Sequence, residues 1–257
     1  MTGPAPLGRW FPYERAVVDG PVRLFCLPYA GGSAAIYRDW QAQLAGVAEV
    51  WPVQLPGRGG RLRERCIDAI DELVDRLVEA IGARTDRPFA LFGHSMGGIV
   101  AFELARRAPD AFGRPAQVLF VSATPAPTMF GTEGSAVDAL DDGALVDQLR
   151  RLNGTPDEVL RDPELLRLVL PALRADLRLC ESYGGPPPGA VLDCRVRVFA
   201  GTDDHGTDAA ALDGWRATTS ADCIVRHVPG GHFFIHGSSG PLLRALADDL
   251  GAVAGTH

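Results

Sequence analysis

The sequence lacks any long apolar run and contains no lysine. No stretch of 18 consecutive apolar residues occurs, and residues 1–15 do not combine a basic start with an apolar core. These absences predict neither a membrane span nor a secretory signal, so we expect a cytoplasmic protein without a membrane partner. All 25 basic residues are arginine, yet the net charge is −7. An acidic chain of this kind is not expected to bind nucleic acid.

Cysteine is scarce and irregularly placed. The residues are widely separated, with no C-x-x-C pair and no histidine at metal-ligand spacing. An odd number at such spacing argues against a disulfide framework and against a structural metal site. We therefore expect reduced thiols that act as small apolar side chains. The five cysteines are Cys26, Cys66, Cys180, Cys194 and Cys223.

Strand-like apolar runs alternate with helical periodicity through much of the chain. Its 257 residues and 46% hydrophobic content suit one domain with a large core. Strand-like runs begin at Val22, Phe89 and Val118, and apolar spacing from 67 to 81 predicts an amphipathic helix. Such alternation is typical of a mostly parallel central sheet flanked by helices. We therefore predict a single α/β domain over residues 1–257.

The alternation breaks between residues 125 and 188. Helical patterns follow one another there, with no strand-like run between them. Residues 155–158 (TPDE) have the pattern of a capping box, and residues 162–164 (DPE) repeat a capped start with proline in the first turn. We interpret residues 125–188 as a helical lid insertion. The alternative is a set of packing helices without a gating role.

A serine between two glycines follows one of the buried strands. Gly93-His94-Ser95-Met96-Gly97 lies between the apolar run 89–92 and a helical pattern at 98–105. A G-x-S-x-G sequence at a strand-to-helix turn is typical of the nucleophile elbow of α/β-hydrolases. Such a turn is tight enough to strain the serine backbone, and it exposes Oγ at the positive end of the helix. The pattern predicts Ser95 as a nucleophile.

A serine nucleophile needs a base, and an acid that orients the base. In α/β-hydrolases they follow in the chain order serine, acid, histidine, each after a strand. Here residues 199–204 end one strand with Asp203 and Asp204, and residues 228–232 end another with His232. His232 is the predicted base, because imidazole accepts and returns protons near neutral pH. Asp204, third after the strand-ending glycine, is favoured over Asp203 as the acid.

An oxyanion hole needs two backbone N–H groups aimed at the developing negative charge. The amide of Met96, directly after the nucleophile, is one predicted donor. The other is expected from the glycine-rich loop at 29–32, where we favour Ala30 and keep Gly31 as the alternative. A glycine-rich loop also suits phosphate binding, but the Walker pattern is absent.

Several longer motifs surround these residues. In the regions of alternating strands and helices they are LPYAGGS (27–33), LPGR (55–58), FGHSMGG (92–98) and GGH (230–232). In the insertion they are LNGTP (152–156), DPE (162–164) and LRAD (173–176). With these motifs the chain closely resembles, nearly end to end, the type II thioesterases that accompany polyketide and nonribosomal peptide synthases. Tyr29 is a departure, since several relatives carry histidine or phenylalanine there.

The resemblance implies housekeeping hydrolysis. Family members remove stalled or incorrect acyl or aminoacyl groups from the phosphopantetheine arm of acyl or peptidyl carrier proteins. On this chain it implies that Ser95 attacks the thioester, His232 acts as the base, Asp204 holds His232, and Ala30 and Met96 bind the oxyanion. It requires no metal and no redox cofactor. We expect a monomer whose partner is a carrier protein.

Carrier proteins are usually acidic, so docking on an acidic chain requires a local basic area. The densest group of arginines comprises Arg58, Arg61, Arg63 and Arg65. It is interpreted either as part of a docking or phosphate-contacting surface or as an ordinary solvated arginine-rich loop.

Three other functions compete with the housekeeping thioesterase. A carboxylesterase or lipase would use the same catalytic residues on oxygen esters. A chain-terminating thioesterase domain would cyclise its product, although the start at Met1 without an upstream carrier domain favours a free-standing enzyme. A catalytically silent binding module of the hydrolase fold is disfavoured by the complete order of serine, acid and histidine.

Overall fold

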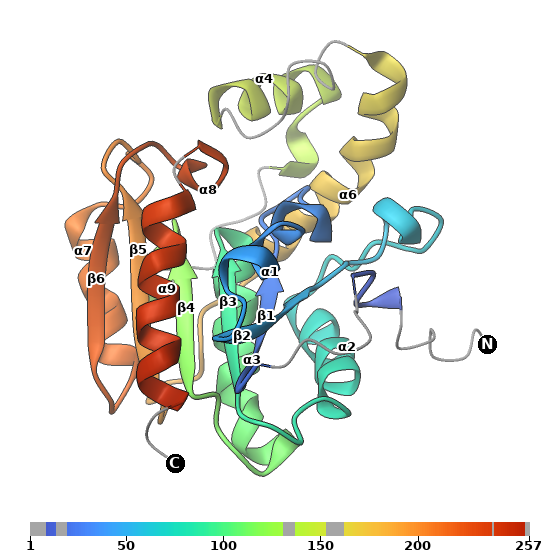
Figure 1. Ribbon diagram of the computed structural model, residues 1–257. Helices are drawn as coiled ribbons and strands as arrows, with labels where there is room; N and C mark the ends of the chain where they lie inside the picture. Colours follow the sequence, from blue (N-terminus) through green and yellow to red (C-terminus); the bar gives the residue numbers. More distant parts are fainter. Residues whose placement is uncertain (1–8, 14–19, 131–136, 153–161, 238, 255–257) are drawn as a thin grey trace.

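A six-stranded parallel sheet organises the structure (Figure 1). The computed structural model describes residues 9–13, 20–130, 137–152, 162–237 and 239–254. In these residues the strand order is β2-β1-β3-β4-β5-β6, and each neighbouring pair is parallel. The strands are β1 (Val22–Leu27), β2 (Ala48–Pro52), β3 (Phe89–His94), β4 (Val118–Ser122), β5 (Arg195–Gly201) and β6 (Cys223–Val228). The predicted fold class is confirmed.

Successive residues of a strand point to opposite faces of the sheet, and here both faces are buried. Along β1, Phe25 and Leu27 join one apolar layer, whereas Leu24 and Cys26 join the other. The first layer is covered by α2 (Ile70–Gly82) and α3 (Met96–Phe112), the second by α1 (Trp40–Gln43) and α9 (Ser239–Ala254) (Figure 1). Burial on both faces explains why the strands read as nearly continuous apolar runs.

The regular elements described between β4 and β5 are all helical, and turns and coil connect them. They are α4 (Asp142–Leu152), α6 (Pro163–Glu181) and the short 3-10 turns η4 (Pro127–Met129) and η5 (Val137–Ala139). Asp162 caps α6 by accepting the N–H groups of Glu164 and Leu165, as its sequence predicts. The predicted capping box at 155–158 lies outside the described residues. Figure 1 shows α4 beyond the ends of the strands, on the side where the strand arrows point.

The carboxyl ends of parallel strands meet at one edge of a sheet, and ligands of open α/β sheets bind outside that edge. The loops after β1, β3, β5 and β6 therefore converge. They carry Ala30, Ser95, Asp204 and His232, the last just before α8 (Phe234–Gly237). A short helix, α7 (Ala209–Asp213), and the 3-10 turn η6 (Gly214–Thr218) connect β5 to β6. Among the described residues, none of the helices has the length and apolarity that crossing a bilayer demands.

Candidate active site

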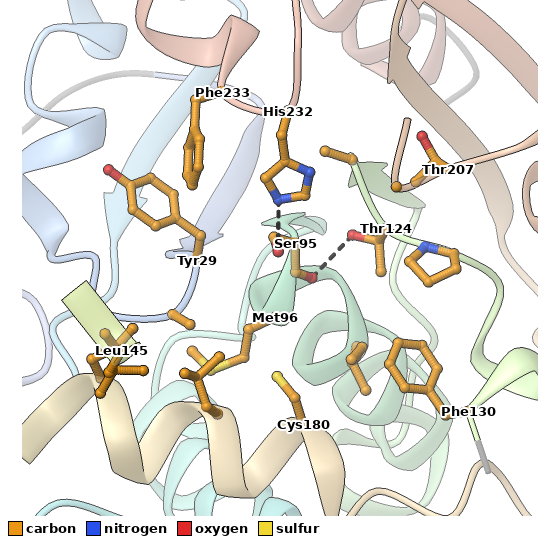
Figure 2. Close-up of a pocket in the computed structure, with 17 residues that line it drawn as sticks. Tyr29, Ser95, Met96, Thr124, Phe130, Leu145, Cys180, Thr207, His232 and Phe233 are labelled. Carbon is orange, nitrogen blue, oxygen red and sulfur yellow. Dashed lines mark hydrogen bonds between the residues drawn. The ribbon is translucent and has the colours of Figure 1, made fainter. Parts of the chain in front are cut away.

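Ser95 occupies the turn between β3 and α3. Its backbone has φ 53° and ψ −120°, a strained conformation for a residue with a side chain. The flanking glycines leave no space for more atoms: a Cβ at Gly93 would lie 1.9 Å from the Gly97 carbonyl oxygen, and one at Gly97 would lie 2.3 Å from the Leu27 carbonyl oxygen. Thr124 Oγ1 donates to the Ser95 carbonyl oxygen at 3.0 Å and holds the turn from the loop after the next strand (Figure 2).

The structure brings Ser95, His232 and Asp204 into one hydrogen-bonded line, although the first two are 137 positions apart. His232 Nε2 lies 3.1 Å from Ser95 Oγ (Figure 2), and His232 Nδ1 lies 3.0 Å from Asp204 Oδ2. Both distances are within hydrogen-bond range. The arrangement has the geometry of a serine nucleophile, a general base and an orienting carboxylate.

The protonation of this line follows from the environment of Asp204. Burial opposes ionisation of its carboxyl group, but the hydrogen bonds from His232 and from the Gly206 amide outweigh burial and hold the pKa below its usual value. An ionised carboxylate only accepts hydrogen bonds. His232 Nδ1 therefore carries the proton, and Nε2 is left to accept the hydrogen of the Ser95 hydroxyl.

Asp203, the alternative acid, does not reach this line. Its side chain is exposed, and its backbone N–H donates to the Gly230 carbonyl oxygen at 2.9 Å. That contact ties the loop after β5 to the loop before His232. Asp203 therefore helps to join the two loops through its backbone, while the side chain of Asp204 turns toward the imidazole.

The two predicted oxyanion donors lie on the wall of the same cavity as Ser95. Met96 is the first residue of α3, where a backbone N–H has no intrahelical acceptor. Gly31 is already engaged, because its N–H donates to Asp176 Oδ2 at 2.7 Å. Within the described part of the chain, the N–H of Ala30 has no acceptor. The contacts thus support Ala30 over Gly31 as the second donor.

A cavity of about 260 Å³ opens beside Ser95 and His232 (Figure 2). Its wall is mainly apolar and combines the loops at the strand ends with α4 and α6 of the insertion. The insertion contributes Phe130, Leu145, Leu173, Leu177 and Cys180. An apolar enclosure with few polar groups near a nucleophile suits an acyl chain rather than a charged substrate.

Tyr29 forms an aromatic part of the cavity wall. Its hydroxyl is directed away from Ser95 (Figure 2) and lies 2.8 Å from Nε2 of His236. The ring packs edge-on against Phe233, with centroids 4.8 Å apart. The tyrosine therefore leaves the cavity side of this position apolar, despite its departure from the relatives' residues.

His94 lies directly before the nucleophile, but its ring is fully buried under the site. Nδ1 lies 2.9 Å from Ser122 Oγ, and the ring centroid is 5.5 Å from that of His232. Burial, and then the neighbouring imidazoles of His232 and His236, hold the pKa of His94 well below its usual value of 6.5. The ring is therefore neutral at physiological pH and packs against the base.

The arginines at 58–65 do not form one basic surface. Arg61 is buried: it pairs with Glu64 at 2.7 Å, and its guanidinium carbon lies 4.0 Å from the ring centroid of Trp10. Arg58 is buried too, against Asp176. The interpretation of this group as a docking surface or solvated loop is wrong for both residues, because Trp10 and Glu64 enclose Arg61 and Asp176 pairs with Arg58 inside the protein.

Arg63 and Arg65 remain exposed, and Arg65 pairs with Glu72.

Asp176 was missed as a site residue by the sequence analysis. The sequence did contain a signal: the motif LPGR (55–58) ends in an arginine and the motif LRAD (173–176) ends in an aspartate, and these two opposite charges could pair.

The described residues contain no cluster of three or more histidine, cysteine, aspartate or glutamate side chains that could hold a metal ion. The five cysteines are free thiols. Burial raises the pKa of Cys26 and Cys180, so neither is disposed to act as a thiolate. Ser95 is therefore the candidate nucleophile at the cavity.

Comparison with known proteins decides the family. The family model for the thioesterase domain matches residues 22–252. The chain belongs to the thioesterase family. This thioesterase is 37% identical to linear gramicidin dehydrogenase LgrE of Brevibacillus parabrevis over 94% of its own length and 92% of LgrE. The name of LgrE refers to a dehydrogenase, whereas the family model denotes a thioesterase, in agreement with the residues around Ser95.

Two solved structures extend the comparison. The type II thioesterase BorB from the borrelidin biosynthetic cluster is 40% identical, with a TM-score of 0.83 over 93% of this chain and 96% of BorB. YbtT, a type II thioesterase from the yersiniabactin NRPS/PKS biosynthetic pathway, is 28% identical, with a TM-score of 0.81 over 93% of this chain and 97% of YbtT. The thioesterase described here is thus a type II thioester hydrolase with the α/β-hydrolase fold.

Proposed function

We propose that this thioesterase hydrolyses stalled or incorrect acyl and aminoacyl thioesters on the phosphopantetheine arm of acyl or peptidyl carrier proteins in polyketide or nonribosomal peptide synthesis. The observation that supports it most is the hydrogen-bonded line of Ser95, His232 and Asp204 at the end of an apolar cavity. The similarity to BorB and YbtT supports the choice of substrate class.

The proposed reaction has two halves. In acylation, Ser95 Oγ attacks the thioester carbonyl carbon while His232 Nε2 takes the hydroxyl proton. The carbonyl oxygen becomes negative and is stabilised by the N–H groups of Ala30 and Met96. When the carbon–sulfur bond breaks, His232 returns the proton to the departing thiol, and the acyl group stays on Ser95.

In deacylation, His232 removes a proton from water, which attacks the ester carbonyl of the acyl-enzyme. The same two amides would hold the second oxyanion. As the ester bond breaks, His232 protonates Ser95 Oγ and the carboxylic acid leaves. Asp204 keeps the ring in one tautomer and stabilises the imidazolium formed in each half.

The cavity supports a preference for small acyl groups. Its volume of about 260 Å³ lies below the ~300–1,000 Å³ typical of sites that enclose drug-sized ligands. A short apolar acyl chain suits such a space better than a complete polyketide or peptide. That preference agrees with removal of stalled short units. Residues 1–257 would act as a single domain and a cytoplasmic monomer, with the insertion at 125–188 as a lid over the cavity.

The experiment is steady-state hydrolysis of acyl-loaded carrier proteins, with a p-nitrophenyl ester of the same acyl group for comparison. We expect a higher kcat/KM on the carrier thioester, loss of both activities in Ser95→Ala, and loss of fluorophosphonate labelling in that variant. A higher kcat/KM on the oxygen ester would support the carboxylesterase alternative. An absence of labelling in the native enzyme would support a silent binding module.

A further inference from the structure

A buried ion pair ties α6 to the loop that holds Ala30. Asp176 lies on α6, and Arg58 follows β2; Arg58 Nη2 is 2.8 Å from Asp176 Oδ1, while Nη1 contacts Oδ2. The two residues are 118 positions apart in the sequence. They are only 6% and 1% exposed, respectively. The insertion is therefore attached, inside the protein, to a loop at the carboxyl end of the sheet.

The same two side chains also hold the loop itself. Asp176 Oδ2 accepts the N–H of Gly31 at 2.7 Å, and Arg58 Nη1 donates to the carbonyl oxygen of Gly32 at 3.3 Å. The N–H of Gly32 donates back to the Tyr29 carbonyl oxygen at 2.8 Å. Of the three consecutive amides from 30 to 32, the second and third thus have acceptors. The amide of Ala30 is left for a ligand.

Helix α6 presents one face to both the loop and the cavity. Residues 173, 177 and 180 line the cavity, and Asp176 lies one turn along from the first of them. A Cβ on Gly31 would lie 3.3 Å from Leu173 Cδ1, so the helix packs closely on the loop. Gly31 also has φ +77°, a conformation that favours glycine. The wall of the cavity and the anchor of the loop are therefore one rigid element.

A gain in stability does not by itself explain the buried pair of Arg58 and Asp176. Moving two charges out of water is costly, and well-packed apolar residues often stabilise a core as well as a buried ion pair does. What apolar residues could not supply is an acceptor for the Gly31 N–H and a donor for the Gly32 carbonyl oxygen. The pair fixes the direction of the peptide groups next to Ala30.

We propose that Arg58 and Asp176 are positioning residues for hydrolysis, which hold the Ala30 N–H toward the oxyanion and make a competent oxyanion hole depend on the seating of α6. The inference rests on the proposed role of Ala30. It goes beyond the triad, because it assigns part of transition-state binding to a side chain of the insertion.

The test uses two probes that need Ser95 and the oxyanion hole but no carrier protein. The first is p-nitrophenyl acetate hydrolysis. The second is inhibition by an alkyl trifluoromethyl ketone. Ser95 Oγ adds to its carbonyl carbon, and the resulting anionic oxygen lies in the oxyanion hole. In Asp176→Asn we expect kcat to fall at least ~10-fold, towards the ~10²–10³ cost of losing one donor, with KM changed less than ~3-fold. The inhibition constant should rise by the same factor as kcat falls.

Two further variants separate positioning from stability. Asp249→Asn breaks a partly buried pair with Arg197, at 2.8 Å, on the α9 side of the sheet and outside the cavity lining. We expect it to lower Tm without changing kcat or inhibitor affinity. Arg58→Met combined with Asp176→Asn removes both charges, so it avoids an unpaired buried charge that could prevent folding. We expect this double variant to fold and to lose kcat like Asp176→Asn.

The outcomes separate the two proposals. If Asp176→Asn and the double variant fold and keep kcat and the inhibition constant within ~2-fold of native, the pair is only a structural tether and the inference fails. If the native enzyme fails to hydrolyse carrier-bound thioesters, the proposed function fails. The inference about the oxyanion hole would still hold if Asp176→Asn loses kcat on p-nitrophenyl acetate and affinity for the trifluoromethyl ketone by the same factor.

Discussion

Replacing Asp204 with asparagine gives a sharp test of the proposed triad, because its two carboxylate oxygens have separate tasks. Oδ1 accepts the Gly206 N–H at 3.0 Å, and Oδ2 faces His232 Nδ1 at 3.0 Å. Asparagine has one oxygen. If that oxygen stays with Gly206, the amide –NH₂ group faces Nδ1 and can only donate. The ring must then carry its proton on Nε2, where it points at Ser95 instead of accepting from it.

The expected loss follows from that tautomer. An inverted imidazole cannot act as the base, and the equivalent change in a serine hydrolase triad lowers kcat about 10⁴-fold. A loss of that size corresponds to about 5 kcal/mol of transition-state stabilisation. We therefore expect Asp204→Asn to lower kcat ~10⁴-fold at neutral pH, with a native-like unfolding curve as evidence of intact structure.

The assay is hydrolysis of an acyl N-acetylcysteamine thioester, which mimics the end of the phosphopantetheine arm. Asp203→Asn is the matched control, since the residue is adjacent, chemically identical and exposed. It should retain kcat within ~2-fold. The proposed triad is refuted if Asp203→Asn loses as much as Asp204→Asn, or if Asp204→Asn loses less than ~10-fold.

Three further changes address the elbow, the buried imidazole and the cavity. Gly97→Ala places a Cβ 2.3 Å from a backbone carbonyl oxygen, so it should lower the free energy of unfolding in urea by at least ~1–3 kcal/mol. The control is Gly251→Ala in α9, where a Cβ would meet nothing within 4 Å, and this change should stabilise the protein slightly. Burial holds the pKa of His94 below its usual 6.5, so the unfolded chain binds more protons below that pH and native stability falls on acidification. His94→Gln should reduce that slope by up to ~1.4 kcal/mol per pH unit, measured as unfolding free energy between pH 7 and ~5. Leu177→Trp fills the cavity and should lower kcat/KM for an octanoyl thioester at least ~10-fold more than for an acetyl thioester.

Most of the sheet could be predicted because the inner strands β1, β3 and β4 are buried on both faces. The start of β1 at Val22 agrees with the sequence, since its apolar run is bounded by Pro21 and Pro28. The helix expected to begin at 67 begins at Ile70, which is the ordinary uncertainty of a helix end. Between β5 and β6 the chain forms α7 followed directly by the 3-10 turn η6, and apolar spacing alone does not show where one ends and the other begins.

The convergence of Ser95 and His232 was predictable because parallel strands bring their carboxyl ends together. Asp204 was favoured over Asp203 by its position third after Gly201, and the structure turns Asp204 toward His232. Periodicity could not make that choice, because adjacent residues differ only in how the loop turns them. The burial of Arg58 was also unpredictable from local sequence. Arginines near glycines usually remain in water, and its partner lies on a helix far along the chain.

The two helices of the proposed lid are held by contacts of different strength, and this limits how the cavity could open. The C-terminal half of α6 is fixed by the buried Asp176, whose release would leave an unpaired charge inside the protein. In contrast, the described side chains of α4 that pack on α6 do so through a small apolar cluster that includes Leu145, and through an exposed pair of Asp142 with Arg174 at 2.7 Å. Exposed pairs contribute little, about 0–1 kcal/mol. We therefore expect α4 to move while α6 stays seated, so that substrate can enter without loss of the oxyanion hole. Faster amide hydrogen exchange in α6 near Asp176 than in α4 would contradict this division.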